Sequence, residues 1–188
     1  MFFQNEYATI DITKIYGERC PLEKTAYDLV YNIKDIDEED IFGIMKIKVS
    51  TKSHQYTVAL LGFYLSGEDN AILEEDILTI LMNNVVIKLN LQTGKILSSV
   101  QFELFGTGDG IYKIDGGYIL RGEAEIIRLN KDLNVIWRFS GRDIFYLPSG
   151  EESFVMCDDS IKLYDFLGYF YEIDYDGNPI REIPPIRR

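Results

Sequence analysis

The chain has 188 residues, of which 46% are hydrophobic, so it is long enough for one domain with a sizeable core. Its 31 acidic and 19 basic residues give a formal net charge of −12. This charge argues against binding to nucleic acid or to anionic membranes, because phosphate contacts require clustered lysine or arginine, and it would instead attract a basic protein.

The start of the chain shows no targeting pattern. Residues 1–6 contain no basic segment and no long apolar stretch, so we expect no secretory signal. The longest strongly apolar run, at 58–65, is far shorter than the roughly 20 residues that span a bilayer. We therefore expect a cytoplasmic protein, in which Cys20 and Cys157 are free thiols.

Residues 1–56 are expected to form a hairpin that caps the rest of the chain. Hydrophobic residues alternate along 27–33 and again along 41–49, on either side of a polar, acidic stretch. A period of two favours strands. A competing pattern at 21–29, where a proline precedes apolar residues at helical spacing, fits one face of a short helix.

The same turn occurs three times, at residues 90–94, 130–134 and 174–178, so that successive copies lie 40 and 44 residues apart. Each copy leaves one apolar strand and enters another. The first residue is Asn or Asp, which can bond the backbone ahead of it, and the fifth is Gly or Asn, which tolerate a left-handed backbone. A repeat of this period built from short strands predicts units that stack in series.

Aligned on these turns, the strands divide the rest of the chain into three units of four antiparallel strands within a single domain. The units are placed at residues 57–105, 106–140 and 141–188, and their first strands at 58–65, 111–114 and 144–147. The third unit is longer before its turn, which predicts an insertion at 158–167.

Four antiparallel strands in about 40 residues is the layout of a propeller blade. The turn at 89–95, an apolar strand end followed by Asn and then Gly, resembles the blades of quinoprotein-type or WD-repeat-like β-propellers. There is no Trp-Asp dipeptide, and the only tryptophan, Trp137, lies in the last strand of the second unit. The resemblance covers 57–183 and implies a mostly β fold of tandem blade-like units, either a small closed ring that includes the cap or an open, partial propeller.

No pattern predicts catalysis, a metal or a cofactor. The only histidine, His54, lies in a polar stretch, and neither cysteine has neighbours at zinc-ligand spacing. Residues 174–178 begin like a calcium loop, but Pro179 and Pro185 occupy the positions that need Gly and Glu. The glycine-rich stretch 106–110 lacks the Lys and Ser or Thr of a phosphate-binding loop. We therefore expect a protein that is not an enzyme and holds no cofactor.

Acidic clusters in the expected loops are the remaining candidate binding residues. Propeller-like folds gather their loops on two rims, where acidic loops would form a negative patch and tyrosines would supply apolar anchors for a basic protein. The predicted contact residues are Asp37, Glu38, Glu39, Asp40, Glu68, Asp69, Glu151, Glu152, Asp158, Asp159, Tyr164, Tyr169 and Tyr175.

Small size, negative charge and the lack of catalytic groups together indicate an intracellular protein-binding module. The most concrete version of this module is an inhibitor that neutralises a basic toxin such as a nuclease. In its general type, though not in any motif, such a protein resembles bacterial toxin immunity proteins. Two alternatives stay open. One is a propeller-like scaffold that self-associates through exposed sheet edges, and the other is a carboxylate-dependent hydrolase.

Overall fold

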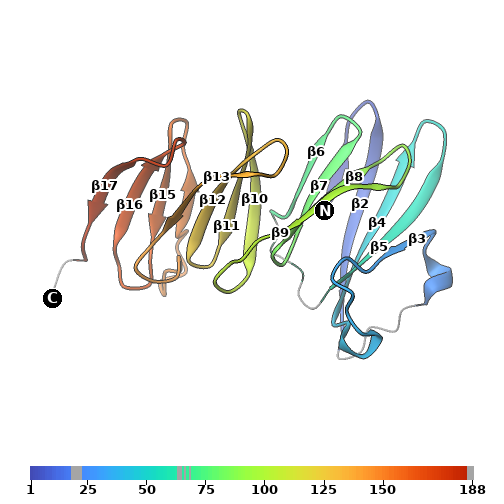
Figure 1. Cartoon of the computed structure of the whole chain (residues 1–188), viewed down its shortest axis with the longest axis horizontal. Coiled ribbons are helices and arrows are strands. Elements are labelled where there is room, and N and C mark those ends of the chain that lie inside the picture. Colours follow the sequence, from blue (N-terminus) through green and yellow to red (C-terminus); the bar gives the residue numbers. More distant parts are fainter. Residues whose placement is uncertain (18–22, 63–64, 66, 68, 186–188) are drawn as a thin grey trace. The chain divides into compact units, whose positions relative to one another are not determined.

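The computed structural model describes residues 1–17, 23–62, 65, 67 and 69–185. The chain is mostly β, as predicted, and within these residues its strands form four sheets (Figure 1). Contacts divide the chain into two compact units, Met1–Phe102 and Glu103–Arg188, which we call the N-terminal and C-terminal units. No helix among the described residues is long and apolar enough to cross a membrane.

The N-terminal unit contains two sheets. The first, in the order β1-β2-β4-β5-β3, is built from β1 (Phe2–Gln4), β2 (Ala8–Tyr16), β4 (Gly43–Thr51), β5 (Gln55–Gly62) and β3 (Leu29–Tyr31). The second, in the order β6-β7-β8-β9, is built from β6 (Ala71–Glu74), β7 (Ile77–Met82), β8 (Val85–Asn90) and β9 (Ile96–Gln101). All strand pairs are antiparallel except β3 with β5.

The pairing of the N-terminal strands differs from the expected hairpin. β4 pairs with β2 and β5, whereas β3 lies at the sheet edge beside β5, so the two alternating segments share a sheet without being neighbours. β5, expected as the first strand of the first repeat, belongs to this sheet, and the second sheet begins at β6. In place of the expected short helix there is a 3-10 turn, η1 (Lys24–Ala26), while Cys20, Pro21 and Leu22 lie outside the described residues.

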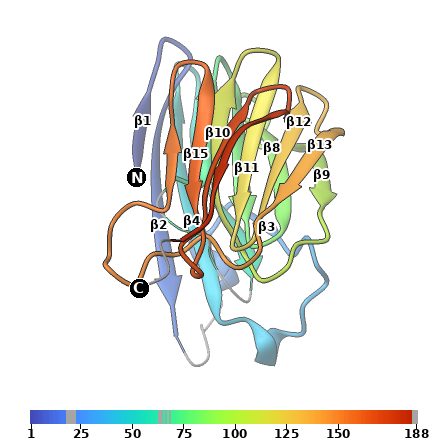
Figure 2. The ribbon, with the colours of Figure 1, turned by 90° about the vertical axis from the view of Figure 1, so that its left-hand side faces the viewer.

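The C-terminal unit also contains two sheets, each with its strands in sequence order. One is built from β10 (Gly108–Ile114), β11 (Gly117–Gly122), β12 (Glu125–Asn130) and β13 (Val135–Ser140), which lie side by side in Figure 2. The other is built from β14 (Phe154–Met156), β15 (Ser160–Tyr164), β16 (Phe170–Asp174) and β17 (Pro179–Ile183). The four strands expected in the second repeat are therefore present.

The third repeat differs from its prediction. Residues 144–147 are not a strand, and the segment 158–167 is not an insertion, because it contains β15, which pairs with both β14 and β16. Ile161 and Leu163 of β15 are fully buried, so this strand is central to the sheet. The sheet thus begins at β14, and residues 141–153 form a long loop that connects it to β13.

The three repeated turns share one hydrogen-bond scheme. In each, the side-chain Oδ1 of the first residue accepts hydrogen bonds from two backbone N–H groups further along the turn, as predicted. Asn90 accepts from Gln92 and Thr93 (3.1 and 2.9 Å), Asn130 from Asp132 and Asn134 (2.9 and 2.8 Å), and Asp174 from Asp176 and Asn178 (3.0 and 2.8 Å).

The left-handed residue of these turns is not always the fifth. Gly94 has a φ of 69°, but in the other two copies the left-handed residue is the fourth, Leu133 at 66° and Gly177 at 87°. Leu133 is a leucine with only 2% of its surface exposed, so burial of its side chain compensates for an unfavourable backbone conformation.

A bulge accompanies each turn. The register between the third and fourth strands shifts after Lys88, Arg128 and Glu172, always two residues before the capping Asn or Asp. The extra residue on the fourth strand is Leu97, Ile136 or Ile180, and each is more than half exposed. The repeat therefore extends from the turn into the pairing of the strands it connects.

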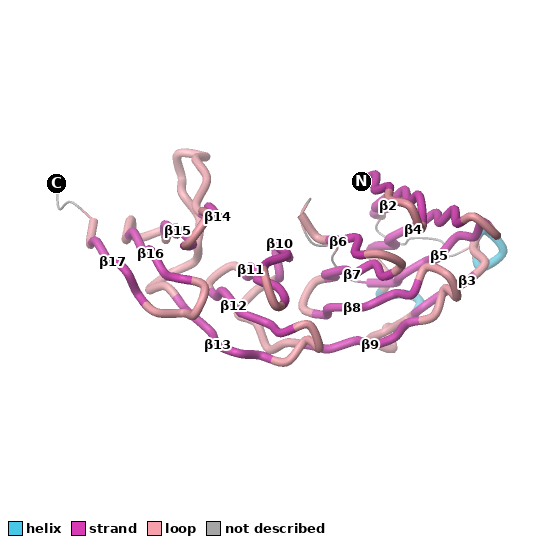
Figure 3. The backbone as a smooth tube through the Cα atoms, turned by 90° about the horizontal axis from the view of Figure 1, so that it is seen from above, coloured by secondary structure: helices cyan, strands magenta, loops and turns pink. Residues whose placement is uncertain are grey.

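Each unit buries its core between its own two sheets. In the N-terminal unit, Met45 and Ile47 of β4 and Leu78 and Ile80 of β7 belong to one fully buried cluster. In the C-terminal unit, whose sheets lie face to face in Figure 3, the core is more aromatic and includes Phe145, which has only 3% of its surface exposed. These cores hold the strands in place and leave the connecting loops at the sheet ends.

We expect Asn130→Ala to lower the free energy of unfolding by about 1 kcal/mol, because two backbone N–H groups lose their acceptor. Asn130→Asp keeps an acceptor oxygen at the same position and should remain close to the wild type. Urea denaturation followed by tryptophan fluorescence measures both variants. Equal stability of Asn130→Ala and the wild type would contradict the role of this side chain.

Candidate functional site

The structure divides the predicted contact residues between the two units. Residues 37–40, which include the 3-10 turn η2 (Glu38–Asp40), and Asp69 are exposed on the N-terminal unit. Glu68 lies outside the described residues. The other seven predicted residues belong to the C-terminal unit, so the expected acidic surface is spread over both.

Within the C-terminal unit, the predicted residues lie at opposite ends of the sheet β14–β17. Glu151 and Glu152 precede β14, Tyr164 ends β15 and Tyr169 precedes β16, which places these four at one end. Three others lie in the turns at the opposite end, namely Asp158, Asp159 and Tyr175.

Tyr175 supports the fold. Its ring is half-buried, and its hydroxyl donates a hydrogen bond to the backbone carbonyl of Cys157 (2.8 Å). Burial, and then the neighbouring Cys157, Asp158 and Asp159, raise the pKa of Tyr175, so the hydroxyl stays protonated as a donor. Cys157 itself is a free cysteine.

The end of the sheet that carries Tyr164 exposes a group of large apolar side chains. Tyr146 is 52% exposed, Phe166 50%, Leu167 52% and Tyr164 37%. The rings of Tyr146 and Phe166 stack with centroids 6.4 Å apart, although they come from two loops about 20 residues apart, 141–153 and 165–169. We call these four side chains the aromatic loop surface, and Glu151 and Glu152 are exposed at the same end of the sheet.

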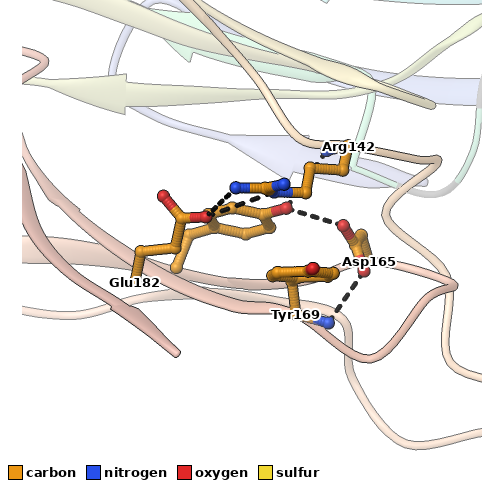
Figure 4. Close-up of polar contacts among 5 residues, drawn as sticks. Arg142, Asp165, Tyr169 and Glu182 are labelled. Carbon is orange, nitrogen blue, oxygen red and sulfur yellow. Dashed lines mark hydrogen bonds and ion pairs between the residues drawn. The ribbon is translucent and has the colours of Figure 1, made fainter. Parts of the chain in front are cut away.

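A buried carboxylate holds the second of these loops. Asp165 is fully buried, and its Oδ1 accepts a hydrogen bond from the backbone N–H of Tyr169 (2.9 Å) while its Oδ2 accepts one from the hydroxyl of Tyr171 (2.7 Å) (Figure 4). The N–H of Phe166 donates to the carbonyl of Ile144 (2.8 Å), which joins the two loops directly.

Arg142 fixes the first loop to the sheet. Its guanidinium lies 4.5 Å from the ring centre of Tyr169 and donates hydrogen bonds to Glu182 of β17 (2.9 and 3.2 Å) (Figure 4). Its backbone N–H donates to the hydroxyl of Tyr171 (3.1 Å). The hydrogen bond to Glu182 raises the pKa of Arg142, so the guanidinium is charged. Tyr171 therefore joins the anchor of one loop to the anchor of the other.

The protonation state of Tyr171 follows from its surroundings. Burial, followed by the hydrogen bond to Asp165, raises the pKa of Tyr171 to about 12. The hydroxyl is consequently protonated at neutral pH and donates to the carboxylate. With both oxygens of Asp165 accepting hydrogen bonds, the cluster acts as a rigid support for the loops.

The described part of the chain offers few other groups that could bind a metal or take part in catalysis. No group of three or more His, Cys, Asp or Glu side chains there is arranged to hold a metal ion. His54 lies in the exposed turn between β4 and β5, where its Nδ1 bonds the hydroxyl of Ser53 (2.7 Å).

Tyr146, Phe166 and Leu167 are absent from the sequence-based contact residues. The sequence predicts that Phe166 and Leu167 lie in an insertion and that Tyr146 lies in a strand. The signal that the sequence offers for this surface is the apolar pair Phe166-Leu167, which directly follows Asp165 in a segment rich in turn-forming residues. Only the packing of two distant loops reveals that these rings are exposed together.

No protein-family model matches the chain, and no curated protein matches its sequence. Its structure is similar to BamB from Moraxella catarrhalis, a propeller-type protein, with a TM-score of 0.53 and 11% identity over 98% of this chain and 52% of that chain. It is also similar to the computationally designed Ika8 protein, with a TM-score of 0.51 and 8% identity over 79% of this chain and 47% of that chain.

These similarities concern the fold alone, because the identities are so low. They confirm the propeller-like arrangement of four-stranded sheets that the repeats predicted. The chain spans about half the length of the solved structures that it matches.

We expect Tyr171→Phe to destabilise the protein at pH 7 by about 1–3 kcal/mol, because Asp165 loses a buried donor. A tyrosine whose pKa is raised on folding stabilises the fold below its unfolded pKa of about 10, and this contribution is lost as the pH rises through its folded pKa of about 12. The wild type should therefore lose its advantage over Tyr171→Phe between these two values.

Urea denaturation at pH 7, 9 and 11 measures the difference between the two proteins. Tyr146→Phe, at an exposed ring, serves as the matched control and should follow the wild type throughout. A constant difference between Tyr171→Phe and the wild type across this pH range would rule out the assigned hydrogen bond.

Proposed function

We propose that this protein is a non-enzymatic protein-binding module that recognises a basic protein. The observation that carries the proposal is the aromatic loop surface, in which Tyr164, at the end of β15, and three apolar side chains on the neighbouring loops are exposed around a buried carboxylate. Aromatic side chains are enriched among the residues that dominate the binding energy of protein interfaces, and clustered exposed apolar groups commonly mark interaction sites.

The rigidity of the surface supports this proposal. Binding is weakened by the entropy lost when loops become ordered, and that loss is small where the loops are already fixed. Asp165 and Arg142 fix both loops before any partner arrives. A surface that served only to cover the core would not require exposed rings on such supports.

The charge of the chain supports a basic partner. Glu151 and Glu152 are exposed at the same end of the sheet as the rings, and the net charge of −12 would accelerate encounter with a cationic protein. The most concrete form of the proposal is an inhibitor that blocks a basic toxin, such as a nuclease, in the cytoplasm, a role similar in type to that of bacterial toxin immunity proteins. The partner, rather than a membrane or a nucleic acid, would occupy the aromatic loop surface.

A second candidate function is self-association through a sheet edge. All five residues of β17, the edge strand of its sheet, are exposed. Pro179 and the charged Arg181 and Glu182 oppose pairing at this edge, since they are residues that proteins use to protect edge strands. Sedimentation velocity at increasing protein concentration separates the candidates, because only self-association makes the mass rise.

We expect Phe166→Ala to weaken binding of the partner by about tenfold or more, as for a central anchor of an interface. The protein is used as bait in a lysate of its source cell at about 50 mM and about 300 mM salt, over which surface charge interactions weaken markedly. The affinity for the purified partner is then measured by calorimetry. Phe2→Ala removes an exposed ring from the N-terminal unit and should bind as the wild type does. Capture of no partner, or equal affinities for the two variants, contradicts the proposal.

The double variant Glu151→Gln, Glu152→Gln should slow association several-fold at low salt and have little effect at high salt, because it removes charge beside the contact. The double variant Asp158→Asn, Asp159→Asn removes the same charge at the opposite end of the sheet and should have a smaller effect. Stopped-flow kinetics with the purified partner measures both rates. Equal slowing by the two variants would show that the contact does not lie at the aromatic loop surface.

A further inference from the structure

An open pocket of about 320 Å³ lies beside the aromatic loop surface. Its walls include Phe105 before β10, Glu125 at the start of β12, and Gly141, Asp143 and Ile144 at the start of the loop after β13. The pocket neighbours the aromatic loop surface, because Ile144, one of its lining residues, accepts the N–H of Phe166 at its backbone carbonyl. A partner that covers those rings would therefore also reach the pocket.

Asp143 is the one carboxylate at the pocket that is not paired with a cation among the described residues. Glu125 forms an ion pair with Arg138 (2.9 Å). Arg142 also lines the pocket, but its guanidinium is paired with Glu182 (2.9 Å). Asp143 accepts a hydrogen bond from the N–H of Ile144 (2.8 Å) and forms no ion pair with any residue that the structure describes. The pocket therefore favours a positively charged occupant.

The aromatic ring in the pocket favours arginine over lysine. Phe105 is 67% exposed, so much of its side chain is accessible to solvent. A guanidinium is planar, stacks on an aromatic face and donates hydrogen bonds to a carboxylate in a fixed geometry, whereas a lysine ammonium is a compact, strongly hydrated charge. A ring and a carboxylate in one pocket thus suit arginine better than lysine.

The protein already holds one of its own arginines by the same chemistry. Arg142 lies over the ring of Tyr169 and is bonded to Glu182 at a distance of 2.9 Å (Figure 4). In the adjacent pocket, Phe105 and Asp143 offer the corresponding ring and carboxylate to a guanidinium from outside.

We propose that this pocket binds an arginine side chain of the protein partner. This inference rests on the proposed function and specifies it: the basic partner is recognised by an arginine inserted between Phe105 and Asp143, next to the aromatic contact. Glu125, which is paired with Arg138, also lines the pocket.

The test uses the isolated protein and two small probes, N-acetyl-arginine methylamide and N-acetyl-lysine methylamide, followed by backbone amide shifts in NMR. We expect saturable shifts at Phe105, Ala124, Gly141 and Asp143, with the arginine probe binding roughly two- to fivefold tighter than the lysine probe, as for an exposed cation–π contact. Asp143→Asn should reduce binding of the arginine probe to the level of the lysine probe. Asp132→Asn, at an exposed carboxylate of the β12–β13 turn, should leave it unchanged.

Shifts spread over the acidic loops, equal binding of the two probes, or equal effects of Asp143→Asn and Asp132→Asn would each overturn this inference. Asp143→Asn must retain the wild-type spectrum away from the pocket for the comparison to hold. Failure here can be separated from failure of the proposed function, since the effect of Phe166→Ala on partner binding does not depend on the pocket.

Discussion

A β-sheet has two faces, and it is stable only when a neighbour covers at least one of them. In the first sheet of the N-terminal unit, successive residues of β4 point to opposite faces, so Ile47 packs toward the second sheet and Ile44 lies on the other face. Ile36 and Ile41 cover the outer face around Ile44. The segment before β4 thus covers the outer face of its own sheet.

The outer face of the last sheet carries charged residues. Lys162 of β15 and Glu172 of β16 are directly opposite each other, on the face away from Ile161 and Ile173 of the core. Paired opposite charges suit a solvated face and discourage the stacking of a further sheet. The loops at the sheet ends therefore do not need to cover these faces, and their exposed side chains can form a binding surface.

In the C-terminal unit, Tyr171 connects the packed core to these loops. Tyr171 belongs to the aromatic core, where its ring packs edge-on against Phe139 at 5.5 Å, and its hydroxyl reaches the buried carboxylate of Asp165. The same residue therefore joins the packed interior to both loops of the aromatic loop surface. The proposed binding of a basic protein depends on this connection, since rings on unsupported loops would lose more entropy on association.

The sequence by itself determined the β class, the three capped turns and the four strands of the second repeat, because alternation and Asx hydrogen bonding are local and act within a few residues. Tertiary structure alone decided that β3 pairs with β5, that β15 is a central strand and that Tyr146 meets Phe166. These outcomes depend on contacts between residues far apart in the chain, which periodicity cannot specify. For the same reason the sequence could name Glu151, Glu152 and Tyr164 as predicted contact residues but could not place them at the same end of the sheet as Tyr146 and Phe166.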